Sequence, residues 1–315
     1  SVLELGNRGS KGGRLGRTRR LRLLCQAAWF ALTNGYAAGF LEKKIYTGKL
    51  KSLCVPGLNC YSCPGALAGC PIGSLQAVLS SSSFTVSCYV LGFLMMFGTL
   101  LGRFICGWLC PFGLVQDLLH KIPFPGKKKN LPGHRFLIYM KYVILVLFVI
   151  LLPSLAVGVT GNGNPWFCKY ICPSGTLMAG LPLGLGNPML RTALGKLFSW
   201  KVFLLVLTVV LSMKYYRPFC KYVCPLGAIY GLFNPISLYR FRIEEKTCIQ
   251  CGACQKVCKM DIRVWKTPNS PECIRCGECM KACPVDAVCY HYGFSKKKQA
   301  DDQSEKSNGK GDLKS

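Results

Sequence analysis

The order of hydrophobic and polar residues divides the chain into a long apolar region and a short polar region. Four apolar stretches each approach the ~20 residues that cross a hydrocarbon core of ~30 Å as a helix. They run from Leu21 to Leu41, Val86 to Ile105, Phe136 to Val157 and Leu197 to Tyr215. After Leu238 the apolar pattern stops. The pattern predicts a mainly α fold, a polytopic membrane helix bundle of about four spans, followed by a small α+β domain.

Polar segments complete the expected domain organisation. Residues 1–20 are rich in Gly, Arg and Lys without apolar periodicity, which predicts a basic disordered tail. Residues 21–238 are the expected transmembrane domain with its loops, and residues 239–293 the small polar domain. Lys, Asp, Ser and Gln dominate residues 294–315, which predicts a second disordered tail.

Composition and charge favour a membrane partner. Half of the 315 residues are hydrophobic and 17% are charged, which is too apolar for most soluble domains of this size. The formal charge is +27, but the basic residues cluster beside the apolar stretches and in both tails, so we expect no nucleic-acid partner. Four spans place both termini on one side, and their basic flanks mark that side as cytoplasmic. We expect a multi-pass protein of the cytoplasmic membrane, in contact with lipid, whose polar domain faces the cytoplasm.

Two cysteine runs in the polar domain form the most specific motif. CIQCGACQKVC and CIRCGECMKACP both have the spacing C-x2-C-x2-C-x3-C. In two-cluster ferredoxins of this spacing, three cysteines of a run hold one [4Fe-4S] cluster and the fourth binds the other cluster. Zinc sites usually pair two CxxC knuckles, so we favour iron and sulfide. The expected ligand sets are Cys248, Cys251, Cys254 and Cys283 for one cluster, and Cys273, Cys276, Cys279 and Cys258 for the other.

Further cysteines lie beside the apolar stretches, where Cys-Pro-x-Gly occurs four times. The second and fourth stretches both end on the cytoplasmic face in a cysteine pair, Cys106 with Cys110 and Cys220 with Cys224. Cysteines four residues apart share a helix face, so two pairs can supply the four thiolates of one cluster. Proline begins the next turn, and glycine lets the backbone approach a cluster closely. The alternative, buried structural cysteines, does not predict the repetition.

The loops on the outer face repeat this design. The cysteines in them are Cys60, Cys63, Cys70, Cys168 and Cys172, with Cys54 as a sixth. One cluster needs four thiolates, so the sequence leaves this ligand set open. The order of outer CPxG, span and inner CPxG occurs twice, which predicts a two-fold-like arrangement about the membrane normal. The cysteines outside this scheme, which we expect to be packing residues, are Cys25, Cys88 and Cys289.

The segments CGWLCPFG and CKYVCPLG beside membrane spans, followed by a two-cluster ferredoxin domain, resemble the polyferredoxin-type membrane 4Fe-4S binding proteins. That group includes membrane quinol-dehydrogenase components of periplasmic nitrate reductase systems, nitrous-oxide-reductase regulators and oxidase-assembly accessory proteins. The resemblance covers about residues 50–290 and implies membrane electron transfer through iron–sulfur clusters, linked to a periplasmic redox partner. The extra outer cysteines depart from a simple quinol-dehydrogenase role and favour a path across the bilayer.

Two classes of function follow. The first is a membrane-bound electron-transfer protein with two clusters in the C-terminal domain and one or two more in the membrane part. Its expected partners are a cytoplasmic donor, such as a ferredoxin or flavoprotein, and a quinone or extracytoplasmic acceptor. No general acid, nucleophile or substrate pocket is visible, so we expect a component of an oxidoreductase system rather than a stand-alone enzyme. The alternative is an accessory or regulatory membrane protein whose clusters sense redox state or assist metalloenzyme assembly.

Overall fold

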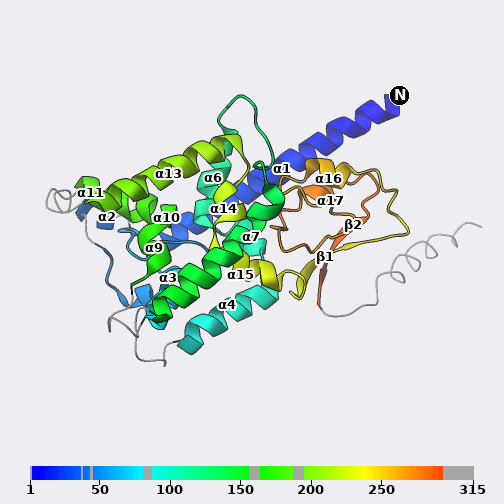
Figure 1. Cartoon of the computed structure of the whole chain (residues 1–315). Helices are drawn as coiled ribbons and strands as arrows, with labels where there is room; N and C mark the ends of the chain where they lie inside the picture. Colours follow the sequence, from blue (N-terminus) through cyan, green and yellow to red (C-terminus); the bar gives the residue numbers. More distant parts are fainter. Residues whose placement is uncertain are drawn as a thin grey trace, which may run out of the picture.

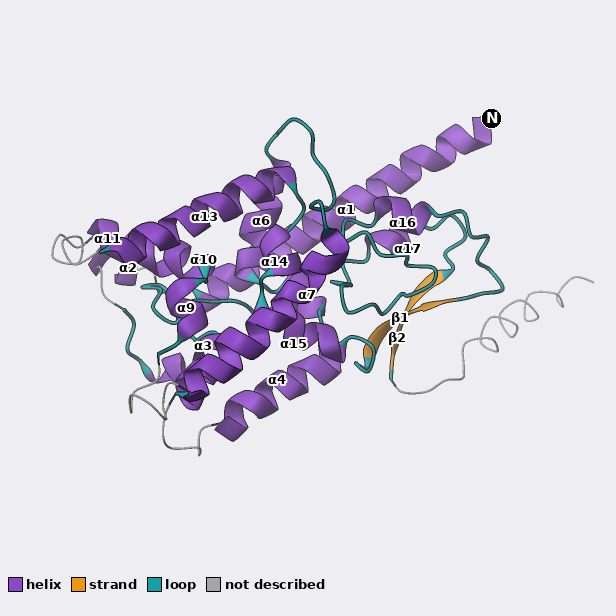
Figure 2. Cartoon of the chain, in the orientation of Figure 1, coloured by secondary structure: helices purple, strands orange, loops and turns teal. Residues whose placement is uncertain are grey.

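The computed structural model describes residues 2–36, 38–42, 45–80, 87–155, 164–186 and 195–293. Helices dominate these residues, and the strands form one small sheet (Figure 2). The prediction of a mainly α fold is therefore confirmed. The expected C-terminal tail, residues 294–315, lies outside the described residues.

The elements follow one another in three groups. The first comprises α1 (Val2–Thr33), α2 (Ala38–Glu42), η1 (Lys49–Ser52), α3 (Pro71–Leu79), α4 (Ser87–Leu101), α5 (Phe104–Trp108) and α6 (Pro111–Lys121). The second comprises α7 (His134–Ile144), η3 (Leu145–Leu151), α9 (Trp166–Tyr170), α10 (Pro173–Gly175), η4 (Thr176–Gly180), α11 (Leu181–Gly186), α13 (Lys196–Lys214), α14 (Pro218–Tyr222) and α15 (Pro225–Phe233). The third comprises β1 (Tyr239–Ile243), α16 (Ala253–Val257), α17 (Glu278–Ala282) and β2 (Val288–Tyr292).

The molecule has two ends joined by long helices (Figure 1). Helices α4, α7 and α13 run along its length. The short helices α3, α9, α10 and α11 lie at the left end, and α16, α17 and the sheet lie at the right end. The N-terminal part of α1 extends toward the upper right, above α16 and α17.

Two helices are long and apolar enough to cross a membrane, by length and composition. They are His134–Leu155, with a mean hydropathy of 2.5, and Lys196–Lys214, with a mean hydropathy of 1.8. In the second, only 11% of the apolar window is buried within the structure. They coincide with the third and fourth expected spans. In the second expected span, the described apolar helix is shorter, Cys88–Leu101. In the first expected span, α1 ends at Thr33.

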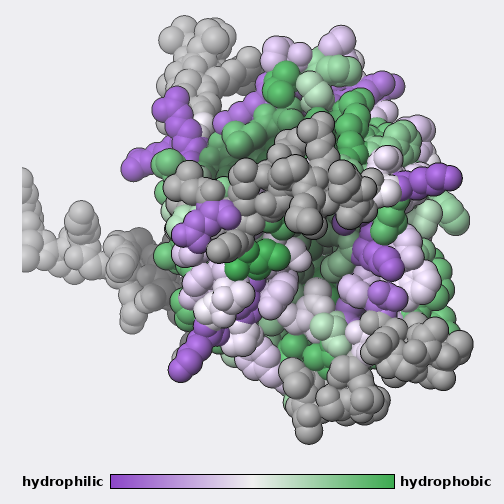
Figure 3. All heavy atoms as spheres, turned by 90° about the vertical axis from the view of Figure 1, so that its left-hand side faces the viewer, coloured by the Kyte–Doolittle hydropathy of each residue, from purple (hydrophilic) through white to green (hydrophobic). Residues whose placement is uncertain are grey.

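The sides of these helices remain apolar and uncovered. Along His134–Leu155 the side chain of Phe136 is 81% exposed, and Val143 and Val146 are also exposed. Along α13, Phe203 and Val206 are exposed in the same way. Figure 3 views the end that carries α11, where hydrophilic and hydrophobic residues are intermixed. The apolar flanks are therefore the surface that a hydrocarbon solvent would stabilise.

Residues 1–20 differ from the sequence prediction, because α1 begins at Val2. Arg22 and Gln26 are buried against other helices, which fixes one turn of α1. Once a turn is fixed, each further residue adds a hydrogen bond, so the helix extends toward the N-terminus. The prediction of a disordered tail is therefore wrong for the described part of this segment.

The C-terminal domain is a small α+β unit. Strands β1 and β2 pair antiparallel, from Tyr239 opposite Tyr292 to Ile243 opposite Val288. Short helices α16 and α17 each follow a glycine in the left-handed conformation, Gly252 and Gly277. The domain has its own core, made of Phe241, Val264, Cys279, Cys283, Ala287 and Val288.

A sharp break separates α4 from α5. Gly102 adopts a φ of +54°, and a Cβ atom there would lie 2.6 Å from the Oδ1 atom of Asn234. That same Oδ1 atom accepts the backbone N–H of Arg103 at 2.9 Å. Glycine is required at this turn because a side chain would clash with the oxygen that caps the next helix.

We predict that Gly102→Ala lowers the free energy of unfolding by more than ~1 kcal/mol, since it adds both strain and a clash. Gly92→Ala in α4 is the matched control, because nothing lies within 4 Å of its added Cβ and its φ is helical. Thermal unfolding of both variants in detergent, followed by circular dichroism, measures the difference. Equal melting temperatures would contradict this account of the break.

Candidate functional site

The four cysteines expected at the inner face lie together in the structure. Cys106 is in α5 and Cys220 in α14, while Cys110 and Cys224 cap the N-termini of α6 and α15. All four side chains are buried and belong to one hydrophobic core. Burial and the neighbouring thiols raise the pKa of Cys224 well above its usual range, so a cation is needed to stabilise a thiolate there.

The local fold follows from the Cys-Pro sequence. Cys110 and Cys224 both have extended backbone angles, and the proline after each occupies the first helical turn. Proline suits that position because its missing N–H would have no helical partner. The backbone N–H of Gly227 then donates to the Sγ atom of Cys224 at 3.4 Å. The motif therefore turns the chain and points a sulfur toward free N–H groups.

Four of the cysteines expected at the outer face line a cavity of about 910 Å³. The cysteines that line it are Cys60, Cys70, Cys168 and Cys172. Burial raises the pKa of Cys70 to about 12 and that of Cys172 to about 11. A cofactor that carries positive iron would offset this cost. The structure thus brings together Cys60 and Cys70 from the loop after the first expected span with Cys168 and Cys172 from the loop after the third.

The other two outer cysteines do not line this cavity. Cys63 is buried beside Lys51, whose Nζ atom donates to the carbonyl oxygens of Cys63 and Ala66. The Sγ atom of Cys54 lies 3.5 Å from the hydroxyl of Ser74. The sequence could not choose among six thiols here, whereas the structure separates four from two.

The ferredoxin-type domain groups its cysteines as the motif predicts. Cys248, Cys251, Cys254 and Cys283 line one small pocket together with Trp265 and Pro284. The remaining four are close enough for their charges to interact: Cys258, Cys273, Cys276 and Cys279. Each group combines three cysteines of one run with the last cysteine of the other run.

These groups fit a cluster better than a single ion. Among the described residues, no three His, Cys, Asp or Glu side chains converge closely enough to hold one metal ion. Two of the groups, that of Cys60 and that of Cys251, line pockets, as ligands placed around a four-iron cluster would. The residues present therefore fit [4Fe-4S] clusters, which would supply one-electron redox chemistry when bound.

Two buried arginines join the inner cysteines to the rest of the fold. Arg217 donates to the carbonyl oxygen of Cys106 at 2.6 Å and to both oxygens of Asp117. Arg103 donates to the carbonyl oxygen of Cys220 at 3.0 Å and pairs with Glu272, which also pairs with Lys141. Each guanidinium thus holds the backbone of a cysteine and is itself held by a carboxylate.

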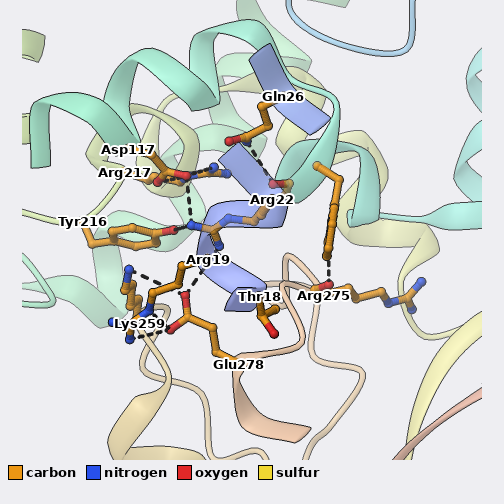
Figure 4. Close-up of polar contacts among 12 residues, drawn as sticks. Thr18, Arg19, Arg22, Gln26, Asp117, Tyr216, Arg217, Lys259, Arg275 and Glu278 are labelled. Atoms are coloured by element: carbon orange, nitrogen blue, oxygen red, sulfur yellow. Dashed lines mark hydrogen bonds and ion pairs between the residues drawn. The ribbon is translucent and has the colours of Figure 1, made fainter. Parts of the chain in front are cut away.

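The ion pairs around Asp117 are buried (Figure 4). Burial acts to raise the pKa of Asp117, but the guanidinium groups of Arg217 and Arg22 outweigh it and lower the pKa to about 2. An unfolded aspartate titrates near about 4, so this stabilisation is present above about pH 4. It is lost only as the pH falls from about 4 toward 2, so the network stays charged at neutral pH.

The C-terminal domain docks directly on the inner cysteines. Gly107, between Cys106 and Cys110, packs against the carbonyl oxygen of Ile274, leaving no room for a Cβ atom. The indole Nε1 of Trp108 donates to the carbonyl oxygen of Arg275 at 3.2 Å. Two cysteine turns, one from each domain, are therefore in backbone contact.

Helix α1 reinforces this docking (Figure 4). Arg19 donates to Glu278 of α17 at 2.9 Å, and Arg22 lies 3.8 Å from the same carboxylate. The Nε2 atom of Gln26 donates to the carbonyl oxygen of Gly107 at 2.9 Å. One face of α1 thus contacts both cysteine-bearing domains.

Sequence reasoning missed the residues that surround the sulfurs. Gln76 and Gln116 are fully buried and donate to cysteine sulfurs, while Arg103 and Arg217 hold cysteine carbonyls. A signal for the two glutamines is present, because each lies six residues after the cysteine of a CPxG motif. The arginines could be suspected only from their place beside the cysteine pairs.

Comparisons with known proteins point to iron–sulfur binding. A family model described as a 4Fe-4S binding domain matches residues 84–132, 144–184 and 197–244. The uncharacterized protein MJ0750 of Methanocaldococcus jannaschii is 29% identical over 206 residues, 63% of this chain and 76% of that protein. The methylamine utilization ferredoxin-type protein MauN of Paracoccus denitrificans is 29% identical over 243 residues, 76% of this chain and 74% of MauN. No solved structure matches.

A regulatory protein is also similar. NosR of Pseudomonas aeruginosa is 27% identical over 161 residues, which cover 49% of this chain and 20% of NosR. The matched segments and the cysteine groups define the class of ferredoxin-type iron–sulfur proteins. Within that class, the chain is a polyferredoxin-type 4Fe-4S binding protein, as its CxxxCP motifs predicted.

We predict that Asp117→Asn destabilises the protein by about 3–5 kcal/mol at neutral pH, because it leaves the buried guanidinium group of Arg217 without a carboxylate and that of Arg22 with Glu278 alone, 3.8 Å away. Thermal unfolding in detergent at neutral pH measures the loss. Glu244→Gln, at an exposed carboxylate of the C-terminal domain, serves as the control and should change little. A loss as small as that of the control would contradict the assigned role of the network.

A second prediction separates the outer cysteines. Cys60→Ser should remove about four iron per chain, since a cluster usually needs all four ligands, whereas Cys63→Ser should retain them. Both residues lie in the same loop, and only Cys60 lines the cavity. Iron and acid-labile sulfide assays on the two purified variants decide the matter. Iron loss from Cys63→Ser alone would overturn the grouping.

Proposed function

We propose that this protein conducts electrons across the cytoplasmic membrane through four [4Fe-4S] clusters. The chain supplies four sets of four thiolates for them. The sets are Cys248, Cys251, Cys254 and Cys283; Cys273, Cys276, Cys279 and Cys258; Cys106, Cys110, Cys220 and Cys224; and Cys60, Cys70, Cys168 and Cys172. The family match covers the second, third and fourth apolar stretches and supports ligation in the membrane part, while the two cysteine runs support it in the C-terminal domain.

The contact between cysteine turns is the observation that carries this proposal. Gly107 touches Ile274, and each of these residues adjoins a cysteine of a different set. Electron transfer needs short distances between carriers, and this contact brings two of the four sets as close as the backbones permit. A purely structural role would not require it.

A second contact continues the path toward the outer set. A Cβ atom on Gly57 would lie 3.3 Å from the Cα atom of Cys110. Three residues later in the chain is Cys60, which lines the outer cavity. Three residues span at most ~11 Å, so the segment from Gly57 to Cys60 bridges the inner and outer sets over a short distance.

The distance along α13 between the outer and inner cysteine sets supports a path across the bilayer. Lys201, near its beginning, lines the outer cavity, and Arg217, just after its end, contacts Cys106. At ~1.5 Å per residue, these positions are ~24 Å apart along the helix direction. That separation approaches a hydrocarbon core of ~30 Å, so the outer and inner sets would lie near opposite faces.

We place the C-terminal domain in the cytoplasm, on the basic side of a multi-pass bundle of about four spans. A cytoplasmic ferredoxin or flavoprotein would then exchange electrons with the exposed Cys251 set, and a quinone or extracytoplasmic protein with the outer set. The chain's own residues bind and orient the clusters, and its apolar core excludes water from the inner set. Electrons could travel in either direction along this path.

Regulation is the second candidate function, and the similarity to NosR favours it, although the match covers 20% of that protein. A sensor would change its redox state slowly and once, whereas a conduit would turn over repeatedly. The two functions therefore differ in rate and in stoichiometry.

We predict rapid transmembrane electron transfer by the full chain in liposomes. Dithionite outside should bleach ferricyanide trapped inside over many turnovers per protein. Cys220→Ser should abolish this transfer by breaking the inner set, while Cys289→Ser, at an exposed cysteine outside all sets, should not. The readout counts only molecules whose C-terminal domain faces outward, determined by protease access.

A bleaching rate equal to that of protein-free liposomes would contradict the conduit. A single stoichiometric oxidation of the protein, without turnover, would favour the regulatory alternative.

A further inference from the structure

Two buried glutamines occupy the same position in two CPxG helices. Gln76 lies six residues after Cys70 in α3, and Gln116 lies six residues after Cys110 in α6. Neither side chain is exposed at all. A buried amide must be hydrogen-bonded or it costs ~1–3 kcal/mol, so the partners of these side chains reveal their role.

Each glutamine donates to a cysteine sulfur of the other half of the bundle. The Nε2 atom of Gln76 lies 3.4 Å from the Sγ atom of Cys168. The Nε2 atom of Gln116 lies 3.0 Å from the Sγ atom of Cys220. In both cases the acceptor is the first cysteine of a CxxxCP segment, about a hundred residues away in sequence.

The orientation of the Gln76 amide is defined by contacts of both its nitrogen and its oxygen, and that of the Gln116 amide by a contact of its nitrogen alone. Nε2 of each also faces the backbone carbonyl four residues earlier, that of Ile72 or Phe112, which can only accept. The Oε1 atom of Gln76 accepts the backbone N–H of Phe167 at 3.0 Å. The N–H groups, rather than the oxygens, must therefore point at the sulfurs.

The amide–sulfur hydrogen bond is found after two of the four CPxG motifs. The two later CPxG motifs have Met178 and Tyr230 at the equivalent position, neither of which carries an amide. Tyr230 instead donates its hydroxyl hydrogen to the carbonyl oxygen of Pro56 at 3.0 Å. Each membrane set thus receives one side-chain amide, always from the first half of the bundle to the second.

We infer that Gln76 and Gln116 are positioning residues that set the reduction potentials of the outer and inner clusters by N–H···S hydrogen bonds. This inference rests on the proposed function, because it requires both membrane sets to hold clusters. A reduced cluster carries more negative charge on its sulfurs, so a donated hydrogen bond stabilises the reduced form and raises the potential. The bond from Gln116 is shorter, so its removal should have the larger effect.

Potentiometric titration of the full chain in detergent, followed by electron paramagnetic resonance, tests the inference. Gln116→Leu should lower the midpoint of one transition, and Gln76→Leu should lower that of a different one. A tenfold change in the ratio of reduced to oxidised cluster corresponds to about 59 mV for one electron. Both variants should retain the iron content of the unaltered protein.

Gln26→Leu is the matched control. Gln26 is equally buried near the inner set, but its Nε2 atom donates to the carbonyl oxygen of Gly107 and to no sulfur. Its substitution should leave every midpoint in place. Gln116→Met and Gln76→Met keep the length of the side chain and remove its N–H donor, so they should lower the same midpoints.

Retained iron with unshifted midpoints would overturn the inference and leave the electron conduit intact. Loss of the site's iron from both the Leu and the Met variant would also overturn it, since the amide would then hold the site together. Absence of any transition beyond those of the C-terminal domain in the unaltered protein would instead defeat the proposed function, and the inference with it.

Discussion

The backbone contact between the Cys106–Cys110 turn and the Cys273–Cys276 turn is the constraint on which the rest of the structure depends. Glycine at position 107 is needed because any side chain would collide with the carbonyl oxygen of Ile274. Arg103 and Arg275 are buried around the contact and bond to backbone carbonyls of both domains. The cost of burying these charges is offset by carboxylate and carbonyl partners, so the two domains are held in one relative orientation.

This docking of the two domains explains why polar residues are buried in an otherwise apolar bundle. Arg217, Asp117 and Arg22 form a buried chain from the inner cysteines to α1, and α1 continues to Glu278 in the C-terminal domain. Each carboxylate shares two or more cations, which keeps the groups charged without leaving one unpaired. The excess of arginine over acid near the inner sulfurs also suits thiolate ligands, which concentrate negative charge.

Sequence patterns predicted the parts of the site that repeat. The CxxC runs indicated the two C-terminal groups because a fixed spacing brings the sulfurs of a run together. The shared helix face expected for Cys106 and Cys110 is wrong, because Cys106 lies in α5 whereas Cys110 has an extended backbone before α6. The outer set could not be chosen because Cys60 and Cys63 have equivalent local signals. Tertiary contacts decide that choice, since Cys60 lines the outer cavity, whereas Cys63 does not and its backbone carbonyl accepts from Lys51. The tail over residues 1–20 was mispredicted for a related reason: contacts of Arg19 and Arg22 with Glu278, distant in sequence, anchor the helix.

Iron and acid-labile sulfide per purified, full-length chain test the central claim most directly. Four sets of thiolates predict about sixteen iron and about sixteen sulfide, at ~4 of each per cluster. Mössbauer spectra of the same iron-57 sample should show [4Fe-4S] clusters alone. A reproducible value of about eight iron, all of it lost on substituting Cys251 and Cys276, would confine the clusters to the C-terminal domain and contradict a path through the bundle.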